Sequence, residues 1–252
     1  MLKLKLVFFA LLINYSLFAN TQNSFEIDSK KNIKSLLTKN YESLLISKIN
    51  LENYYYTNDF KPYWIDEKGI KDIGLSLLNK IKNDPVLKPH VSQLFRLDEV
   101  MNTLNSLDKS NPKYLENLLR IDFMLTELFD RYVTYVTKGS IKWSAFEEKL
   151  TELEKETEIK ASWDKYSLNK DSKLLLKKVI EKNDLSSVLD EIDFNYPQSK
   201  ELVLAIGELE KVSAKGGYTK IPESKSLRVG DVSQTLPFLR KRLFESNDLT
   251  VQ

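Results

Sequence analysis

A carboxylate stands where an apolar side chain is expected. Within residues 111–139, one stripe of apolar residues recurs at helical spacing, at Leu115, Leu118, Leu125, Phe129, Tyr132 and Val136. Asp122 falls in this stripe, and a carboxylate on an apolar face must find hydrogen-bond donors or shift its pKa. Its role is open between two interpretations, a reactive group and a structural hydrogen bond to Thr126 or to an arginine from elsewhere. The structural interpretation is favoured, because structural pairs also perturb carboxylates.

Other groups that do chemistry are scarce. There is no cysteine, which excludes a thiol nucleophile, and the single histidine, His90, has no G-x-S-x-G motif to serve. Zinc needs several His or Cys ligands, and glycine-rich phosphate loops are absent. Glycan cleavage needs only two carboxylates, but acidic runs such as EEKLTELEKETE are typical of a solvated helix. The sequence therefore predicts no catalytic residue, cofactor or metal site, and it leaves the substrate-binding residues unknown.

A dense aromatic group lies in the first third of the chain. Its members are Tyr54, Tyr55, Tyr56, Phe60, Tyr63 and Trp64. These rings can stack on sugars, or they can fill a core beneath the first helix. The core interpretation is favoured, because aromatic side chains dominate core burial.

The elements that position these residues are predicted to be helices, giving an all-α fold around a central apolar helix. The central helix is predicted to start at Asn111-Pro112, with Asn111 as its cap, and to end at Gly139. Residues 20–29 are predicted to be a loose lead-in. The other predicted helices span residues 33–54, 75–81, 98–107, 144–160 with a narrow apolar inner face at Phe146, Leu150 and Leu153, 168–182, 185–192 and 196–215.

The first nineteen residues resemble a secretory signal peptide. Lys3 and Lys5 precede an apolar run, and Leu17-Phe18-Ala19 resembles a cleavage site. The alternative is an uncleaved anchor, because Leu17 is larger than the small residue preferred at that position. Without the two lysines, the 38 basic residues fall to 36 and match the 36 acidic residues. This balance argues against a nucleic-acid partner. We expect export to the periplasm, with no stable membrane span after cleavage.

The last segment, residues 216–252, reads as the start of a second module. Val232, Leu236, Leu239 and Leu243 form one apolar stripe, with Ser233 or Thr235 as its cap and Pro237 in the first turn. A helix this short is marginal in water and needs partners for its stripe.

Three stretches together resemble one family. NDFKPYWIDEKG, LLRIDFMLTELFDRYVTYVTKGSIKW and GGYTKIPESKSLRVGDVSQTLPFLRKRLFESNDL resemble, in this order, segments of the large, scaffold-containing murein L,D-transpeptidases of Gram-negative bacteria. The third stretch is the most specific and has Tyr218 where tryptophan is usual in the family. The resemblance runs from about Ile33 to Leu249.

After the predicted signal peptide at residues 1–19, the resemblance implies a helical scaffold at 20–215, and the linker and first helix of a truncated peptidoglycan-binding-like module at 216–252. Members of the family continue into a β-rich catalytic domain with a cysteine nucleophile, and no catalytic residue carries over to this chain. The expected function is the non-catalytic scaffold portion of a periplasmic L,D-transpeptidase, so activity of this chain alone is not expected. Expected partners are peptidoglycan, cell-wall enzymes or a separately encoded catalytic portion. The alternative is a free-standing periplasmic helical adaptor that contacts the wall or its enzymes.

Overall fold

The computed structural model describes residues 24–39, 41, 46–88, 91–157, 168–192 and 198–250. The predicted signal peptide, His90 and the Tyr196-Pro197 start of a helix lie outside these residues. The chain divides into two compact units, Met1–Phe194 and Asn195–Gln252. None of the described helices is long and apolar enough to cross a membrane.

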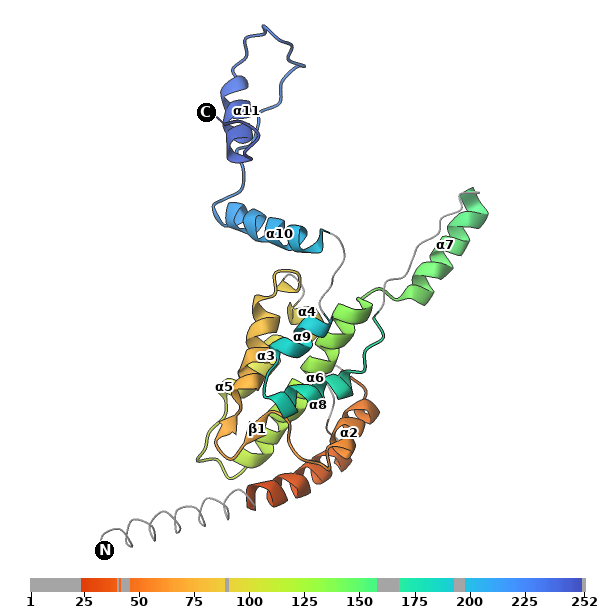
Figure 1. Ribbon diagram of the computed structural model, residues 1–252. Helices are drawn as coiled ribbons and strands as arrows, with labels where there is room; N and C mark the ends of the chain where they lie inside the picture. Colours follow the sequence, from red (N-terminus) through yellow and green to blue (C-terminus); the bar gives the residue numbers. More distant parts are fainter. Residues whose placement is uncertain are drawn as a thin grey trace, which may run out of the picture. The chain divides into compact units, whose positions relative to one another are not determined.

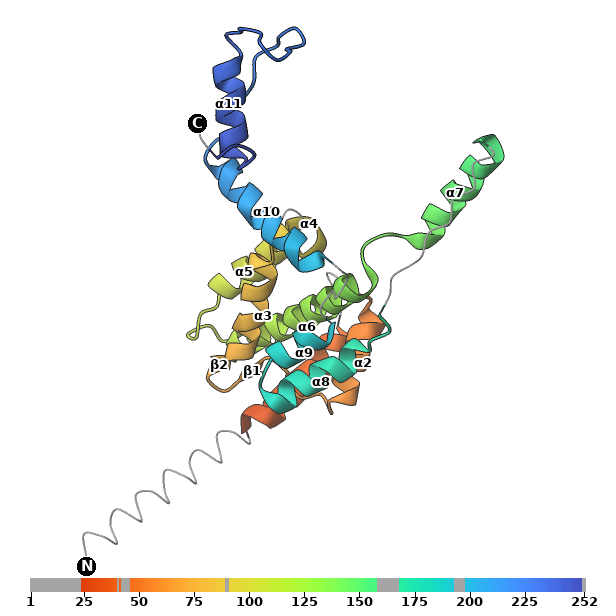
Figure 2. The same cartoon turned by 45° about the horizontal axis from the view of Figure 1, so that its top comes forward.

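A single helix forms the centre of the first unit. Helix α6, Tyr114–Lys138, is buried through its middle, where Leu118, Leu125, Phe129 and Tyr132 of the predicted stripe are in the core, while Leu115 and Val136 near its ends are half-buried. It contacts six shorter helices, and Figures 1 and 2 show several of them packed along its length. These are α2 (Lys48–Thr57), α3 (Asp72–Asn83), α4 (Val91–Phe95), α5 (Leu97–Asn105), α8 (Ser172–Lys182) and α9 (Ser186–Ile192). The predicted all-α fold around a central apolar helix is therefore confirmed.

The start of α6 differs from the prediction, whereas its end matches it. Asn111 does not cap the helix, because its side-chain oxygen accepts from Lys113 N at 2.8 Å and forms a turn that delays the helix to Tyr114. Gly139 ends the helix as predicted, with a positive φ of 74° and its N–H donated to the Tyr135 carbonyl. An L side chain rarely adopts this φ, which explains glycine at this position.

The prediction of one continuous helix over residues 33–54 is wrong. The structure has one helix over residues 24–38 and a second, α2, that starts at Lys48, with residues 39, 41, 46 and 47 not helical. The second helix starts where the Ser47 side chain accepts from Asn50 N, a local cap that apolar spacing does not register. The predicted loose lead-in is also wrong over residues 24–29, which are helical.

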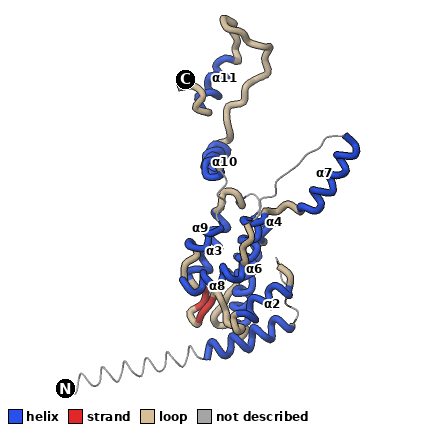
Figure 3. The backbone as a smooth tube through the Cα atoms, turned by 45° about the vertical axis from the view of Figure 1, so that its right-hand side comes forward, coloured by secondary structure: helices blue, strands red, loops and turns tan. Residues whose placement is uncertain are grey.

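A small hairpin lies between α2 and α3. Strands β1 (Ile65–Asp66) and β2 (Gly69–Ile70) pair antiparallel, and they are the strands drawn in red in Figure 3. Two residues per strand give no alternating pattern, which is why the sequence does not predict them. In the following helix, Gly74 packs closely on α6, since a Cβ there would lie 3.2 Å from a methyl group of Leu125.

Apart from α4, which was not predicted, the remaining helices of the first unit follow the prediction with two exceptions. The predicted helices at 75–81, 98–107, 168–182 and 185–192 correspond to α3, α5, α8 and α9. In α3, however, Leu75 faces outward and is 45% exposed. Helix α7, Trp143–Thr157, has no buried residue, and Leu153 is 52% exposed, so its predicted inner face is not covered.

The second unit contains α10 (Ser199–Ala214) and α11 (Leu236–Glu245). Leu236, Leu239 and Leu243 are half-buried in α11, whereas Val232 precedes the helix and is almost fully exposed. Thr235 occupies the N-cap position without a side-chain capping bond, and Ser233 instead accepts from Thr235 N.

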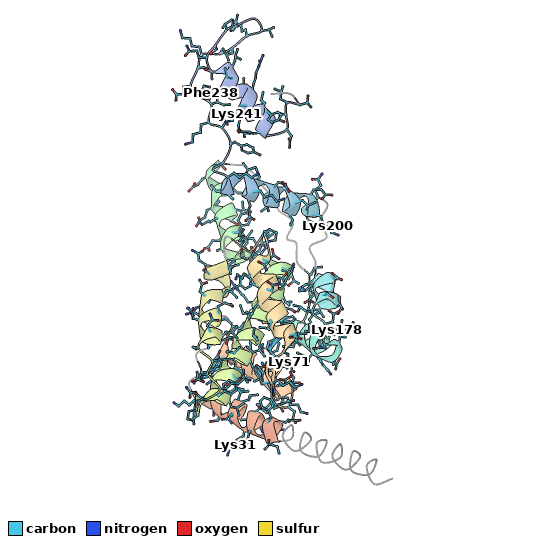
Figure 4. All side chains as sticks on the ribbon, turned by 90° about the vertical axis from the view of Figure 1, so that its left-hand side faces the viewer. Lys31, Lys71, Lys178, Lys200, Phe238 and Lys241 are labelled. Atoms are coloured by element: carbon cyan, nitrogen blue, oxygen red, sulfur yellow. The ribbon has the colours of Figure 1, made fainter. Side chains whose placement is uncertain are left out.

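The segment before α11 is bonded to the helix. The Thr219 N–H and hydroxyl each donate to the Glu245 carboxylate at 2.7 Å. The Arg242 guanidinium lies 3.7 Å from the centre of the Tyr218 ring. Phe238 and Lys241, labelled in Figure 4, lie on the same helix. The structure thus places α10 with α11 in one unit, while the division after residue 215 stays a prediction.

Candidate functional site: the buried carboxylate of Asp122

Asp122 lies on α6 with no exposed surface, and its carboxylate accepts three hydrogen bonds. Oδ1 accepts from Trp64 N at 2.6 Å. Oδ2 accepts from the Tyr55 hydroxyl at 2.6 Å and from Tyr63 N at 3.2 Å. All three donors lie within residues 54–64, which cover the end of α2 and the chain after it and are here called the aromatic segment. The carboxylate therefore joins this segment to the central helix.

Thr126 takes part in the network, but not as predicted. Its hydroxyl donates to the Asp122 backbone carbonyl at 2.9 Å rather than to the carboxylate. The same oxygen accepts from Trp64 Nε1 at 3.1 Å and lies 3.0 Å from the Tyr55 hydroxyl. The structural interpretation of Asp122 is correct, whereas the expected partners, Thr126 or an arginine, are not those that the carboxylate uses.

The chain around Tyr63 and Trp64 bends, which leaves two adjacent N–H groups free to meet one carboxylate. Their carbonyls are also bonded, since Tyr63 O accepts from Lys71 Nζ and Trp64 O from Lys71 N, each at 2.8 Å. Lys71, labelled in Figure 4, thereby binds the carbonyls of the same two residues whose N–H groups bind Asp122.

The aromatic group divides between core and surface. Tyr54, Tyr55, Tyr63 and Trp64 are buried, which confirms the core interpretation for these four rings. Tyr55 packs on Phe123 of α6 with ring centres 4.7 Å apart, and Trp64 packs on Phe129 at 5.8 Å. Tyr56 is 73% exposed and Phe60 is half-buried, so these two rings are not core.

Burial controls the electrostatics of the site. It raises the pKa of Asp122 to about 6, while the bonds from Tyr55, Trp64 N and Tyr63 N and the charge of Lys71 oppose this rise. Burial also raises the pKa of Tyr55 well above its usual value and that of Tyr63 to about 12. At neutral pH, Asp122 is an ionised acceptor and both tyrosines are donors. This carboxylate has no exposed surface and its three hydrogen bonds are all internal, so it supports the structure of the core.

A second cluster lies further along α6. The Tyr54 hydroxyl donates to Asp130 Oδ1 and lies within bonding distance of Ser172 Oγ, each at 2.6 Å, and Ser172 also donates to Asp130. This cluster joins α2, α6 and α8. This cluster was not predicted, although Asp122, Thr126 and Asp130 are spaced four residues apart and so form one polar line on an apolar helix.

The described part of the chain contains no group of three or more His, Cys, Asp or Glu residues placed to hold a metal ion. The absence of metal and cofactor sites over the whole chain stays a prediction.

The family model described as Scaffold domain matches residues 50–205, more than half of the 252-residue chain. This chain belongs to the Scaffold domain family. The matched Scaffold domain begins within α2 and ends within α10, so it contains the Asp122 network and the Tyr54 cluster in full. No curated protein and no solved structure matches the chain.

The buried charge of the Scaffold domain predicts an unusual pH dependence. The pKa of Asp122 is about 6 in the folded protein against 3.8 ordinarily, so the folded state takes up a proton first as pH falls. The contribution of this group to stability therefore rises as pH falls through 6 and levels off below 3.8. Between pH 7 and pH 5 we expect a gain of about 1 kcal/mol in the free energy of unfolding, measured by urea titration.

The controls must separate Asp122 from other groups that can change their protonation between pH 7 and pH 5. The carboxylates with lowered pKa values stay ionised in this window, and they are Asp59, Asp108, Asp184, Glu191 and Glu245. Asp122→Asn should lose the gain, while His90→Gln should keep it. A gain that disappears in His90→Gln instead would contradict the assignment to Asp122.

The second cluster of the Scaffold domain predicts a smaller effect. Tyr54→Phe keeps the buried ring but removes the hydroxyl that bonds Asp130 and Ser172. We expect a loss of about 1–2 kcal/mol in chemical unfolding. Tyr56→Phe, two residues along the same helix and exposed, is the matched control and should change stability by less than about 0.5 kcal/mol. Equal effects of the two substitutions would show that the Tyr54 bonds add nothing.

Proposed function

We propose that this chain is the non-catalytic scaffold portion of a periplasmic murein L,D-transpeptidase, acting in peptidoglycan cross-linking. The observation that carries this proposal is where the resembling stretches lie. NDFKPYWIDEKG contains Tyr63 and Trp64, and LLRIDFMLTELFDRYVTYVTKGSIKW contains Asp122, so the two stretches meet at one buried network. Both lie inside the matched Scaffold domain.

The chemistry of the network agrees with a supporting role. Peptide exchange needs an exposed nucleophile with an activating partner. The 252 residues contain no thiol, and the buried carboxylate of Asp122, whose pKa is raised by burial, is used internally to hold the aromatic segment on α6. In this proposal the chain positions other components, and the exchange reaction is supplied by a cysteine-bearing catalytic domain.

The test compares cross-linking with and without such a domain. The purified chain is incubated with peptidoglycan alone, and then with a catalytic L,D-transpeptidase domain added in trans. We expect no new 3–3 cross-links from the chain alone and an increase over the catalytic domain by itself when both are present, measured by muropeptide chromatography. New 3–3 cross-links made by the chain alone would refute the non-catalytic assignment, and no increase in the mixture would refute the scaffold role.

A periplasmic adaptor is the second candidate. It is favoured by the apolar side chains that α10 exposes, with Leu202, Leu204 and Leu209 between 55% and 71% exposed. Apolar side chains concentrated on one exposed helix are typical of a protein contact surface. Retention of the full chain by immobilised cell-wall enzymes, with no effect on their cross-linking activity, would support the adaptor over the scaffold.

A further inference from the structure

The run Tyr54-Tyr55-Tyr56 sends one ring to the surface. Tyr54 and Tyr55 are almost fully buried, whereas Tyr56 is 73% exposed. Ile49 and Asn53 precede Tyr56 by seven and three residues, so all three share one face of α2. Ile49 is 70% exposed and Asn53 is exposed as well. This face therefore presents a large aromatic ring beside an amide and an isolated aliphatic side chain.

The exposed ring is held by the chain that follows it. The Phe60 ring meets the Tyr56 ring edge-on, with centres 6.2 Å apart and planes at 90°, and Phe60 itself packs against the core. Asp59 and Phe60 both have left-handed backbone conformations, with φ of 52° and 57°. This conformation is uncommon for non-glycine residues and is strained for a bulky one. The Phe60 N–H donates to Tyr55 O at 2.7 Å, which fixes the turn that places Phe60 beside Tyr56.

A basic side chain lies over the Phe60 ring, and two others form ion pairs beside this turn. The Lys34 ammonium lies 4.6 Å from the centre of the Phe60 ring, as in a cation–π contact. Lys30 is bonded to Asp59, and Lys61 is bonded to Glu26. The Lys34 ammonium thus lies over the Phe60 ring and forms neither of these two ion pairs.

We propose that Lys34, Ile49, Asn53, Tyr56 and Phe60, here called the Tyr56 surface, bind the sugar rings of a carboxylate-bearing glycan. The C–H face of a pyranose ring is weakly positive and packs on the negative face of an aromatic ring. The Asn53 amide can donate to and accept from hydroxyl or N-acetyl groups, and Lys34 can bind a carboxylate. Binding is non-covalent, and no bond is made or broken.

The surface fits a glycan better than a protein. It places the exposed Ile49 and Tyr56 beside a lysine and an amide, whereas the core of a protein interface is depleted of charged residues. The inference rests on the proposed function, because peptidoglycan strands combine pyranose rings with peptide carboxylates. It deepens that function by naming the part of the wall that is bound and the residues that bind it.

The test uses the full chain and two soluble probes, N-acetylglucosamine tetramer and peptide-bearing glycan strands released from peptidoglycan. Isothermal titration calorimetry measures the dissociation constants. Tyr56→Ala should weaken binding of both probes at least about tenfold, and Tyr56→Phe should stay within about twofold. Lys34→Ala should weaken binding of the carboxylate-bearing strands but not of the neutral tetramer. Leu174→Ala, which removes a side chain 62% exposed on α8 that is not part of the Tyr56 surface, is the control and should bind like the wild type.

Several results would overturn the inference. These are wild-type affinity in Tyr56→Ala, no binding of either probe by the wild type, or a change of sedimentation coefficient in Tyr56→Ala that shows a protein contact. The trans cross-linking assay separates this inference from the function on which it rests. Normal support of cross-linking by Tyr56→Ala, without any glycan binding by the wild type, would refute the surface and leave the scaffold role standing. If Tyr56→Ala loses glycan binding but the wild type does not support cross-linking, the scaffold role is refuted and the Tyr56 surface stands.

Discussion

Replacing Asp122 by alanine is expected to lower the free energy of unfolding by at least about 3 kcal/mol. The substitution leaves two buried backbone N–H groups, of Tyr63 and Trp64, and the Tyr55 hydroxyl without their acceptor. Each buried donor without a partner costs about 1–3 kcal/mol. Since domains of this size have about 5–15 kcal/mol in total, the loss should be obvious in urea-induced unfolding followed by circular dichroism.

The control for Asp122→Ala is an exposed acidic residue on another helix. Glu152 is exposed on α7, and Glu152→Ala should change stability by less than about 0.5 kcal/mol. If Asp122→Ala were tolerated as well as this control, the carboxylate would not hold the aromatic segment in place.

Trp64→Ala is expected to cost about 3–5 kcal/mol, the second large effect. Trp64 is fully buried, packs on Phe129 and donates its indole N–H to Thr126. Removing the indole leaves a cavity on α6 and takes away one bond of the Asp122 network. The measurement is again the free energy of unfolding from a denaturant titration.

Two further tryptophan substitutions sharpen this prediction. Trp64→Phe keeps an aromatic ring and should recover more than half of the loss. Trp143→Ala, on the helix with no buried residue, should cost less than about 1 kcal/mol. Comparable losses in Trp64→Ala and Trp143→Ala would mean that position 64 has no special part in the core.

The central helix and its unusual residue were predictable because both signals are local. Apolar spacing predicts α6, and a carboxylate within the apolar stripe indicates that hydrogen-bond donors must lie near it. The donors are not predictable in this way, because they are 58 to 67 residues earlier in the chain. Two of them are backbone N–H groups, which every residue except proline has, so no side-chain pattern identifies them.

Where the prediction of the fold fails, short-range bonds override apolar spacing. The apolar positions Leu36 and Leu37 are buried as the pattern requires, yet the helix is interrupted before Ser47 caps α2. Asn111 likewise makes a turn with Lys113 instead of a cap. The Tyr54 cluster was accessible in part, because Asp130 continues the polar line of Asp122 and Thr126. Ser172, 42 residues after Asp130, carries no comparable sign.

The bend at Tyr63 and Trp64 has a consequence for exchange with solvent. Amide hydrogens outside regular helices usually exchange quickly through small local openings. These two are bonded to a carboxylate that has no exposed surface, so they can exchange only when the segment leaves α6. Their deuterium uptake therefore reports how often this segment separates from α6 and opens that part of the core.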